Sequence, residues 1–484
     1  MTTVLHASPY TWAQFSPVFY LIGLAVLILL ADTFLPRLPK QLFPPVGALG
    51  AFVTGCFMIS GTHTNMFGQL VCGGTALCLL MLWDYRSVAY ASVAGGDDTE
   101  GSTELTPLLL IACAGVCALT LSRDLVMLFV SLETLTLSSY AMTGYFRRNQ
   151  GSIEAGVKYL ILGAVSTGML VMGAAWYYGT TGTFSLENPQ PVLNALLRPE
   201  LCTGFLVGIA MLLVAAFFKI GAAPMHTWIP DVYQGAPTPV SAMLAVVSKI
   251  AGFVVLILLI YPESPLAATS QFQELVHPIS AALAAVAALT LLVGNLGAIR
   301  QQNAKRLLGY SSIGQAGFIL VLFISLRQPR MGYEVWFYLL SYGLATIAAF
   351  WAIAQLRMQR GHEQIDAFRG LGKTNPRTAF LITVAFASLA GVPLTGGFLA
   401  KLYSFRALWY ARDAAAIEGC CLLPVMIVCA AAGFYYYFKV LRAMYWERPQ
   451  DTDKPVAFSP LALGMLTLSA LMLVVMGTTP LIIK

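Results

Sequence analysis

Long apolar stretches recur along this chain from residue 17 to its C-terminus, and charged residues gather in the short segments between them. Apolar runs near 20 residues are long enough to cross about 30 Å of hydrocarbon as helices. Strands of a membrane barrel would alternate apolar and polar residues, and these runs do not alternate. The pattern predicts an all-α polytopic membrane protein of about 14 spans, at residues 17–36, 43–61, 66–90, 105–122, 124–146, 153–179, 203–233, 238–261, 277–298, 306–326, 332–356, 377–411, 420–441 and 458–481.

Two of these predicted spans are too long for one simple crossing and contain helix-breaking residues. The seventh contains Pro224, and the twelfth contains Pro393 among the glycines Gly391, Gly396 and Gly397. Proline removes a backbone donor and clashes with the preceding turn. At membrane depth, broken backbone is tolerated where protein or a wet cavity surrounds it. We therefore expect spans 7 and 12 to be broken helices that line such a region.

The spacing of the two breaks predicts the domain organisation. They lie five spans apart, and the two broken spans run in opposite directions across the membrane, as in an inverted repeat. We expect one transmembrane domain over residues 1–484, with inverted five-helix repeats at 104–262 and 277–446. Basic residues concentrate in the loops that lie inside when both termini are placed outside. The acidic segment at 97–104 is discordant, but acidic residues contribute little to this rule.

Composition agrees with a membrane protein and limits the chemistry. The chain is 58% hydrophobic and 10% charged, and it has no basic run interleaved with aromatics that would indicate nucleic-acid binding. Its nine cysteines include no Cys-x-x-Cys pair, although Cys113 and Cys117 are spaced by one helical turn. We interpret the cysteines as small packing residues. We therefore expect neither a metal site nor a redox centre in this chain.

Charged residues inside the apolar stretches are the main functional candidates. A charge at bilayer depth costs several kcal/mol, so it indicates function unless a partner explains it. The alternatives are a structural ion pair for Glu133 and, for the lysines, snorkelling to the interface, which suits Lys158 best because it lies near its helix start. Such a mixture suggests a route for protons or cations, carried by Glu133, Lys158, Lys219, Lys249 and Lys401.

His226 follows the break at Pro224 and adds a group that titrates near neutral pH. It could pass protons between Lys219 and Lys249. A buried histidine with a structural hydrogen bond explains it equally well.

Three stretches carry a resemblance to a known family. They are residues 226–241 followed by Ser248 and Lys249, residues 144–148 followed by 154–160, and residues 305–314. These stretches resemble subunit N (subunit 2), an antiporter-like membrane subunit of the proton-pumping NADH–quinone oxidoreductase, respiratory complex I. The resemblance covers nearly the whole chain. The wider family includes the L- and M-type subunits and the Mrp-type cation/proton antiporters.

The resemblance implies roles for individual residues. A helix 5 glutamate pairs with a helix 7 lysine, which here are Glu133 and Lys219. A helix 8 lysine relays protons centrally, as Lys249 would, and a helix 12 residue opens toward the outside, as Lys401 would. Lys158 matches a helix 6 lysine of the N-type chains.

The resemblance also implies a setting. The location would be a bacterial inner membrane with both termini periplasmic. NADH, FMN, iron–sulfur clusters and quinone would belong to partner subunits. The partners would be an M-type neighbour, the small J-, K- and A-type subunits, the lateral helix of subunit L, and membrane lipids. Two alternatives stay open: an Mrp-type sodium/proton antiporter subunit, and a structural scaffold whose charges no longer work.

Overall fold

The computed structural model describes residues 12–35, 37–58, 63–93, 103–188, 190–260, 270–324, 331–411, 416–448 and 456–479. Within these ranges the chain is helical and contains no β-strand, as the continuous apolar stretches predict. Ten helical segments there are long and apolar enough to cross a membrane, and α4 and α16 are shorter apolar helices. The acidic residues Asp97, Asp98 and Glu100 and both chain ends lie outside the described residues.

The helices follow the predicted apolar stretches, with two additional short helices, α7 and α15, between them. In chain order the α-helices are α1 (Ser16–Phe34), α2 (Phe43–Phe57), α3 (His63–Val93), α4 (Leu105–Thr120), α5 (Leu125–Thr143), α6 (Gln150–Thr181), α7 (Gln190–Leu197), α8 (Pro199–Ile220), α9 (Trp228–Gly235), α10 (Thr238–Met243), α11 (Lys249–Ile260), α12 (Ser270–Ile299), α13 (Ala304–Leu322), α14 (Met331–Arg360), α15 (Leu371–Thr374), α16 (Pro376–Ala390), α17 (Gly396–Ala411), α18 (Ala416–Tyr445) and α19 (Pro460–Thr478). Shorter turns are the 3₁₀ helices η1 (Lys40–Leu42) and η4 (Ile365–Phe368) and the π-helix η2 (Leu244–Ser248).

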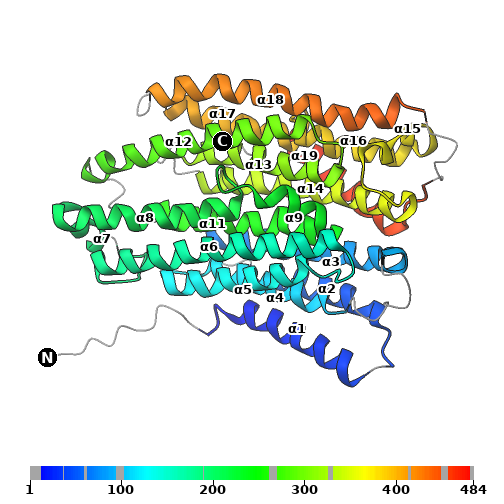
Figure 1. Ribbon diagram of the computed structural model, residues 1–484, viewed down its shortest axis with the longest axis horizontal. Helices are drawn as coiled ribbons and strands as arrows, with labels where there is room; N and C mark the ends of the chain where they lie inside the picture. The colour runs from blue at the N-terminus through cyan, green and yellow to red at the C-terminus, as the bar shows by residue number, and fades with distance from the viewer. Residues whose placement is uncertain are drawn as a thin grey trace.

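The long helices run side by side along the longest dimension of the molecule (Figure 1). Helix α1 lies at one edge of the bundle and α18 at the opposite edge. Helix α14 lies deep inside the bundle, because 89% of the residues in its most apolar stretch are buried. The corresponding stretch of α1 is only 22% buried. The faces of the edge helices that remain exposed are apolar, which suits contact with lipid or with other membrane subunits.

Two helices end inside the bundle, where the sequence predicts breaks. Helix α8 ends at Ile220 before α9 begins, and α16 ends at Ala390 before α17 begins. The residue after each end is a glycine in the left-handed region, Gly221 with φ +74° and Gly391 with φ +87°. Glycine adopts this conformation without the steric cost that a Cβ imposes.

Both ends have the same hydrogen-bond pattern, a Schellman motif. In α8 the Ala222 amide donates to the Phe217 carbonyl at 2.8 Å and Gly221 donates to Phe218 at 3.2 Å. In α16 the Val392 amide donates to Ala387 at 2.9 Å and Gly391 donates to Ser388 at 3.0 Å. The motif leaves the last carbonyls of each helix without backbone donors, so these oxygens need partners from elsewhere.

Candidate functional site

Lys219 and Glu133 lie near each other in the first half of the chain but are not paired. The Lys219 side chain is buried, and its Nζ donates a hydrogen bond to Thr136 Oγ1 on α5. Glu133, one helical turn before Thr136, instead accepts a hydrogen bond from Thr167 Oγ1 on α6 at 2.8 Å. No ion pair within 4.0 Å joins the two charges. The pair implied by the resemblance is therefore open in this structure, with a threonine bound to each member.

Lys249 binds the end of broken helix α8. Its Nζ donates to the carbonyl of Ile220, the last residue of α8, at 3.1 Å, and to the carbonyl of Ser312 on α13 at 2.7 Å. The residue is 2% exposed. The π-helix η2 immediately precedes it, and such turns inside helices often mark functional positions.

Lys401 binds the end of broken helix α16 in the same way. Its Nζ donates to the carbonyl of Ala390, the last residue of α16, at 2.7 Å, and lies 5.2 Å from the centre of the Phe318 ring. The residue is 7% exposed. Each Schellman end thus has its final carbonyl occupied by a buried lysine from a later helix.

This arrangement sets the electrostatics of both lysines. A helix C-terminus carries about half a negative charge, which stabilises an ammonium group. Burial opposes the charged form. Among the described residues, no carboxylate lies within 4.0 Å of the ammonium of Lys219, Lys249 or Lys401. These lysines are therefore held by neutral oxygens, and releasing a proton does not require breaking an ion pair.

A chain of polar residues, which we call the polar file, lies between Lys249 and Lys401. It consists of Ser312, Ser311, Tyr437 and Gln315. Ser312, whose carbonyl binds Lys249, follows Ser311, whose hydroxyl is hydrogen-bonded to Tyr437 of α18. Tyr437 in turn accepts from Gln315 Nε2 at 3.3 Å. Gln315 Nε2 also donates to the carbonyl of Leu389 at 3.0 Å, next to the carbonyl that binds Lys401.

A small cavity of about 10 Å³ lies beside this file, with Gln315, Ser341 and Leu389 among its lining residues. A cavity of this size has room for about one water molecule. The Ser341 hydroxyl is buried there and has no hydrogen-bond partner among the described residues. A water molecule in the cavity would supply that partner and extend the polar file.

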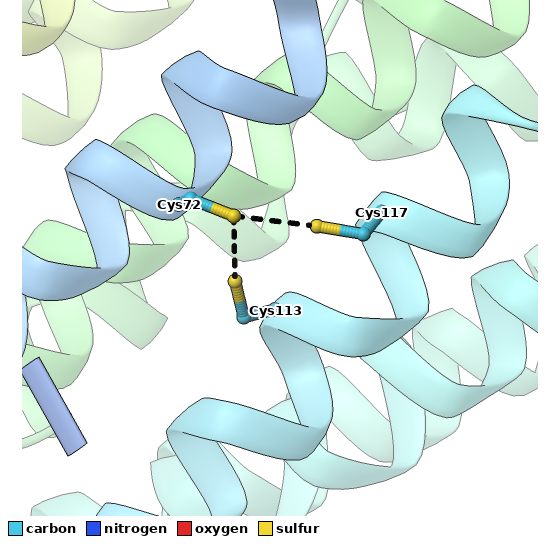
Figure 2. Close-up of side chains that lie close together, drawn as sticks. All are labelled: Cys72, Cys113 and Cys117. Atoms are coloured by element: carbon cyan, nitrogen blue, oxygen red, sulfur yellow. Dashed lines mark hydrogen bonds between the residues drawn. The ribbon is translucent and has the colours of Figure 1, made fainter. Parts of the chain in front are cut away.

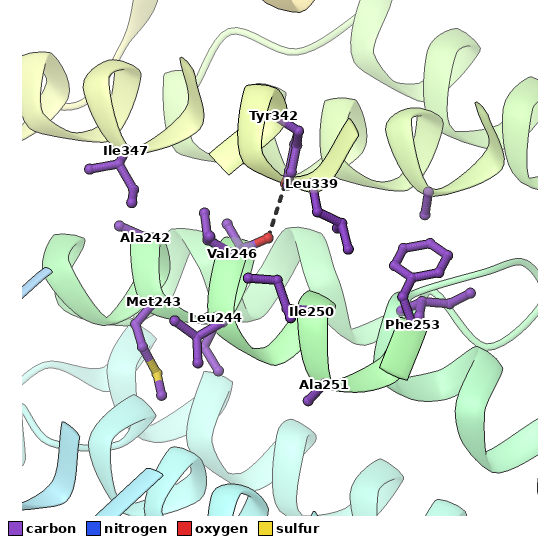
Figure 3. Close-up of a cluster of buried hydrophobic side chains, with 14 of the residues drawn as sticks. Ala242, Met243, Leu244, Val246, Ile250, Ala251, Phe253, Leu339, Tyr342 and Ile347 are labelled. Atoms are coloured by element: carbon purple, nitrogen blue, oxygen red, sulfur yellow. Dashed lines mark hydrogen bonds between the residues drawn. The ribbon is translucent and has the colours of Figure 1, made fainter. Parts of the chain in front are cut away.

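Buried apolar side chains lie between α14 and the helical segment that contains Lys249. Ala242 of α10, Val246 of η2 and Ile250 of α11 lie on the side that faces Ile347 and Leu339 of α14 (Figure 3). The Tyr342 side chain of α14 reaches through this apolar packing. Its hydroxyl donates to the Ala245 carbonyl at 3.1 Å and to Ser312 Oγ at 2.9 Å. The tyrosine therefore joins the π-helix to the same serine whose carbonyl binds Lys249.

Lys158 has a different environment from the other lysines. Its side chain is 44% exposed and forms ion pairs with Glu154 at 2.6 Å and with Asp231 at 2.8 Å. Asp231 also binds Arg306 at 2.5 Å. Glu154, Asp231 and Arg306 line a polar cavity of about 350 Å³. The structure places Lys158 in a charged network beside this cavity, away from the buried file.

His226 lies in the break between α8 and α9 and is half-buried. It contacts the backbone of Pro224, and it forms no hydrogen bond to Lys219 or Lys249 among the described residues. The expected bridging position between the two lysines is therefore not occupied by His226 in this structure.

Sequence reasoning missed several polar residues of the site. Lys305 lies just before the predicted span at 306–326, where a loop charge would be expected, but it is fully buried, donates to the Ala236 carbonyl at 2.7 Å and pairs with Glu363 at 3.1 Å. The file residues on α13 had a detectable signal, because Ser311 and Gln315 share one face of an apolar span. Tyr437 gave no such signal in the sequence, because tyrosine is common in transmembrane helices.

Comparison with known proteins identifies the family. Residues 122–421 match the model of the membrane region of the NADH:quinone oxidoreductase and Mrp antiporter proteins. NADH-quinone oxidoreductase subunit N from Bacillus anthracis is 32% identical over 100% of this chain and 95% of its own length. Subunit N 1 from Opitutus terrae is 36% identical over 87% of this chain and 86% of its own. A chain of respiratory complex I from Thermus thermophilus superposes with a TM-score of 0.76, at 28% identity over 96% of this chain and 98% of that one.

Proposed function

We propose that this chain, which belongs to the subunit N family of NADH–quinone oxidoreductase membrane subunits, carries protons across the membrane through its buried lysines. The observation that supports this most directly is the repeated arrangement at the two broken helices. Lys249 and Lys401 each donate to the last carbonyl of an interrupted helix, and a polar file joins their surroundings. A charge at bilayer depth costs several kcal/mol, so buried ammonium groups there indicate a functional role.

The paired arrangement also supports two inverted repeats, over residues 104–262 and 277–446, within a 14-span domain. Helices α8 and α16 end in the same motif, and each end binds one buried lysine. In this proposal the chain lies in a bacterial inner membrane, with both termini in the periplasm.

The proposed route begins at the charged cavity and ends at Lys401. Protons enter beside Lys158 and Asp231, where the cavity admits water. They reach Lys219, then Lys249, with His226 in the break able to assist after a ring movement. From Lys249 they follow the polar file to Lys401, which releases them toward the periplasm.

Glu133 is the proposed control group for the first step. Two unit charges 4 Å apart interact by about 4 kcal/mol at an effective dielectric constant of 20. Movement of Glu133 from Thr167 to Lys219 would therefore hold a proton on Lys219, and its withdrawal would let the proton leave. The open pair in this structure corresponds to the withdrawn position.

The driving energy comes from redox chemistry elsewhere in the complex. NADH, FMN, iron–sulfur clusters and quinone would be bound by partner subunits. The proposed neighbours are an M-type antiporter-like subunit, the small J-, K- and A-type subunits and the lateral helix of subunit L, all within lipid. The exposed apolar faces of α1 and α6 suit such contacts.

The test compares pumping with electron transfer in proteoliposomes that contain the whole complex. Lys219→Ala should abolish or sharply reduce proton pumping per quinone reduced while the complex still assembles. Lys373→Ala removes an exposed lysine in α15 and should leave the ratio unchanged. Full pumping by an assembled Lys219→Ala complex would reject the relay and favour a structural scaffold. Pumping that requires sodium would favour the Mrp-type alternative that shares the family model.

A further inference from the structure

Three buried cysteines from two helices meet at one point in the N-terminal part of the bundle. Cys72 lies on α3, and Cys113 and Cys117 lie on α4 (Figure 2). The Cys72 sulfur is 3.6 Å from that of Cys117 and 4.0 Å from that of Cys113. All three sulfur atoms lie within 4.8 Å of one another, and all three residues are 0% exposed.

Helix geometry explains why the sulfurs converge. Residues four apart on a helix share a face, so Cys113 and Cys117 both point from α4 toward α3. Helix α2 closes the remaining side, because a Cβ added to Gly55 would lie 3.0 Å from the Cβ of Cys72. Residues of α2, α3 and α4 therefore surround the cluster.

We propose that Cys72, Cys113 and Cys117 bind one soft monovalent d¹⁰ metal ion, Cu(I), in a three-coordinate sulfur site. Thiolate sulfur is the ligand type that selects Cu(I), zinc and iron–sulfur clusters. Zinc in proteins is almost always four-coordinate. Among the described residues, no fourth histidine, cysteine or carboxylate belongs to the group, so three sulfurs without a fourth ligand of these types favour Cu(I).

The net charge of the occupied site also favours a monovalent ion. The site lies within apolar helices, where net charge is costly. One thiol that gives its proton to solvent and binds Cu(I) as a thiolate leaves a neutral site, with two further sulfurs as neutral donors. A divalent ion would need two such deprotonations for neutrality. The bound ion would cross-link α3 to α4 through their cysteine side chains.

Purified complex in detergent, kept reduced with ascorbate, tests the site by Cu(I) titration against a coloured Cu(I) chelator. The wild type should bind one Cu(I) per chain at this site. Cys72→Ser, Cys113→Ser and Cys117→Ser should each weaken binding at least about tenfold, which is 1.4 kcal/mol. Cys429→Ser is the matched control, because it removes a buried cysteine on α18. It should bind Cu(I) as the wild type does.

X-ray absorption at the copper edge supplies a second readout that does not depend on affinity. The wild type should show three sulfur neighbours, and a triple serine variant that retains the wild-type melting temperature should show none. Equal binding by the wild type and this variant would overturn the proposal. So would a copper site with fewer than three sulfurs, or recovery of Cys72 and Cys117 as a disulfide by alkylation and mass spectrometry of freshly prepared membranes.

Discussion

Lys401 donates a hydrogen bond to the carbonyl of Ala390 at 2.7 Å, across the break between α16 and α17. That carbonyl is the last of α16, and the Schellman turn at Gly391 leaves it without a backbone donor. The lysine therefore completes the helix end, and the helix end supplies the partial negative charge that an ammonium needs in an apolar bundle. A change at the turn should consequently be felt at the lysine.

Gly391→Ala should reduce proton pumping while Gly182→Ala should not. Both glycines have positive φ, +87° and +73°, so both substitutions cost about 1 kcal/mol of backbone strain. A Cβ at Gly391 would lie 2.9 Å from Cδ of Lys401, whereas a Cβ at Gly182 would meet nothing within 4 Å. The measurement is protons pumped per quinone reduced in proteoliposomes. Equal loss in both variants would mean that strain, rather than the position of Lys401, is responsible.

Tyr437→Phe should lower pumping because it removes the hydroxyl that joins Ser311 to Gln315. The ring and its packing remain, so assembly should be retained. Tyr177→Phe is the control, since it removes a buried hydroxyl that donates to the Ser185 carbonyl at 3.0 Å, outside the file. The same assay compares the two variants. Full pumping by Tyr437→Phe would show that protons do not need this hydroxyl.

Glu363→Gln should destabilise the protein more than Lys305→Met does. Glu363 pairs with both Lys305 and Arg357. Its loss leaves the fully buried Lys305 ammonium without a carboxylate, a change that costs about 3 kcal/mol or more. Lys305→Met leaves Glu363 with Arg357. Thermal unfolding of the purified complex in detergent measures the difference, and a greater loss in Lys305→Met would contradict this order.

The sequence predicted the helical architecture well because apolar stretches of membrane length have few other structures available. The breaks at residues 221–227 and 391–395 were also predictable, because proline and glycine act on the backbone next to them in the sequence. The candidate lysines were also visible, because a charge in an apolar run is conspicuous. These features depend on neighbouring residues in the sequence.

The partners of those residues were not predictable, because they come from distant segments. The Lys249 ammonium binds carbonyls of Ile220 and Ser312, and backbone oxygens leave no trace in a sequence. The cysteine cluster was not predictable for the same reason, because Cys72 and Cys113 are 41 residues apart and meet only when α3 packs on α4. Lys305 looked like a loop charge because it stands one residue inside the start of α13.

Proton pumping by complexes with Lys401→Arg and Lys401→Ala tests the central claim most directly. Arginine keeps the positive charge but, with a pKa above about 12, it does not release a proton at neutral pH. If Lys401 passes protons, both variants should assemble, reduce quinone and pump clearly less than the wild type. If arginine restores full pumping and alanine does not, Lys401 is a fixed charge at the end of α16, and protons leave by another route.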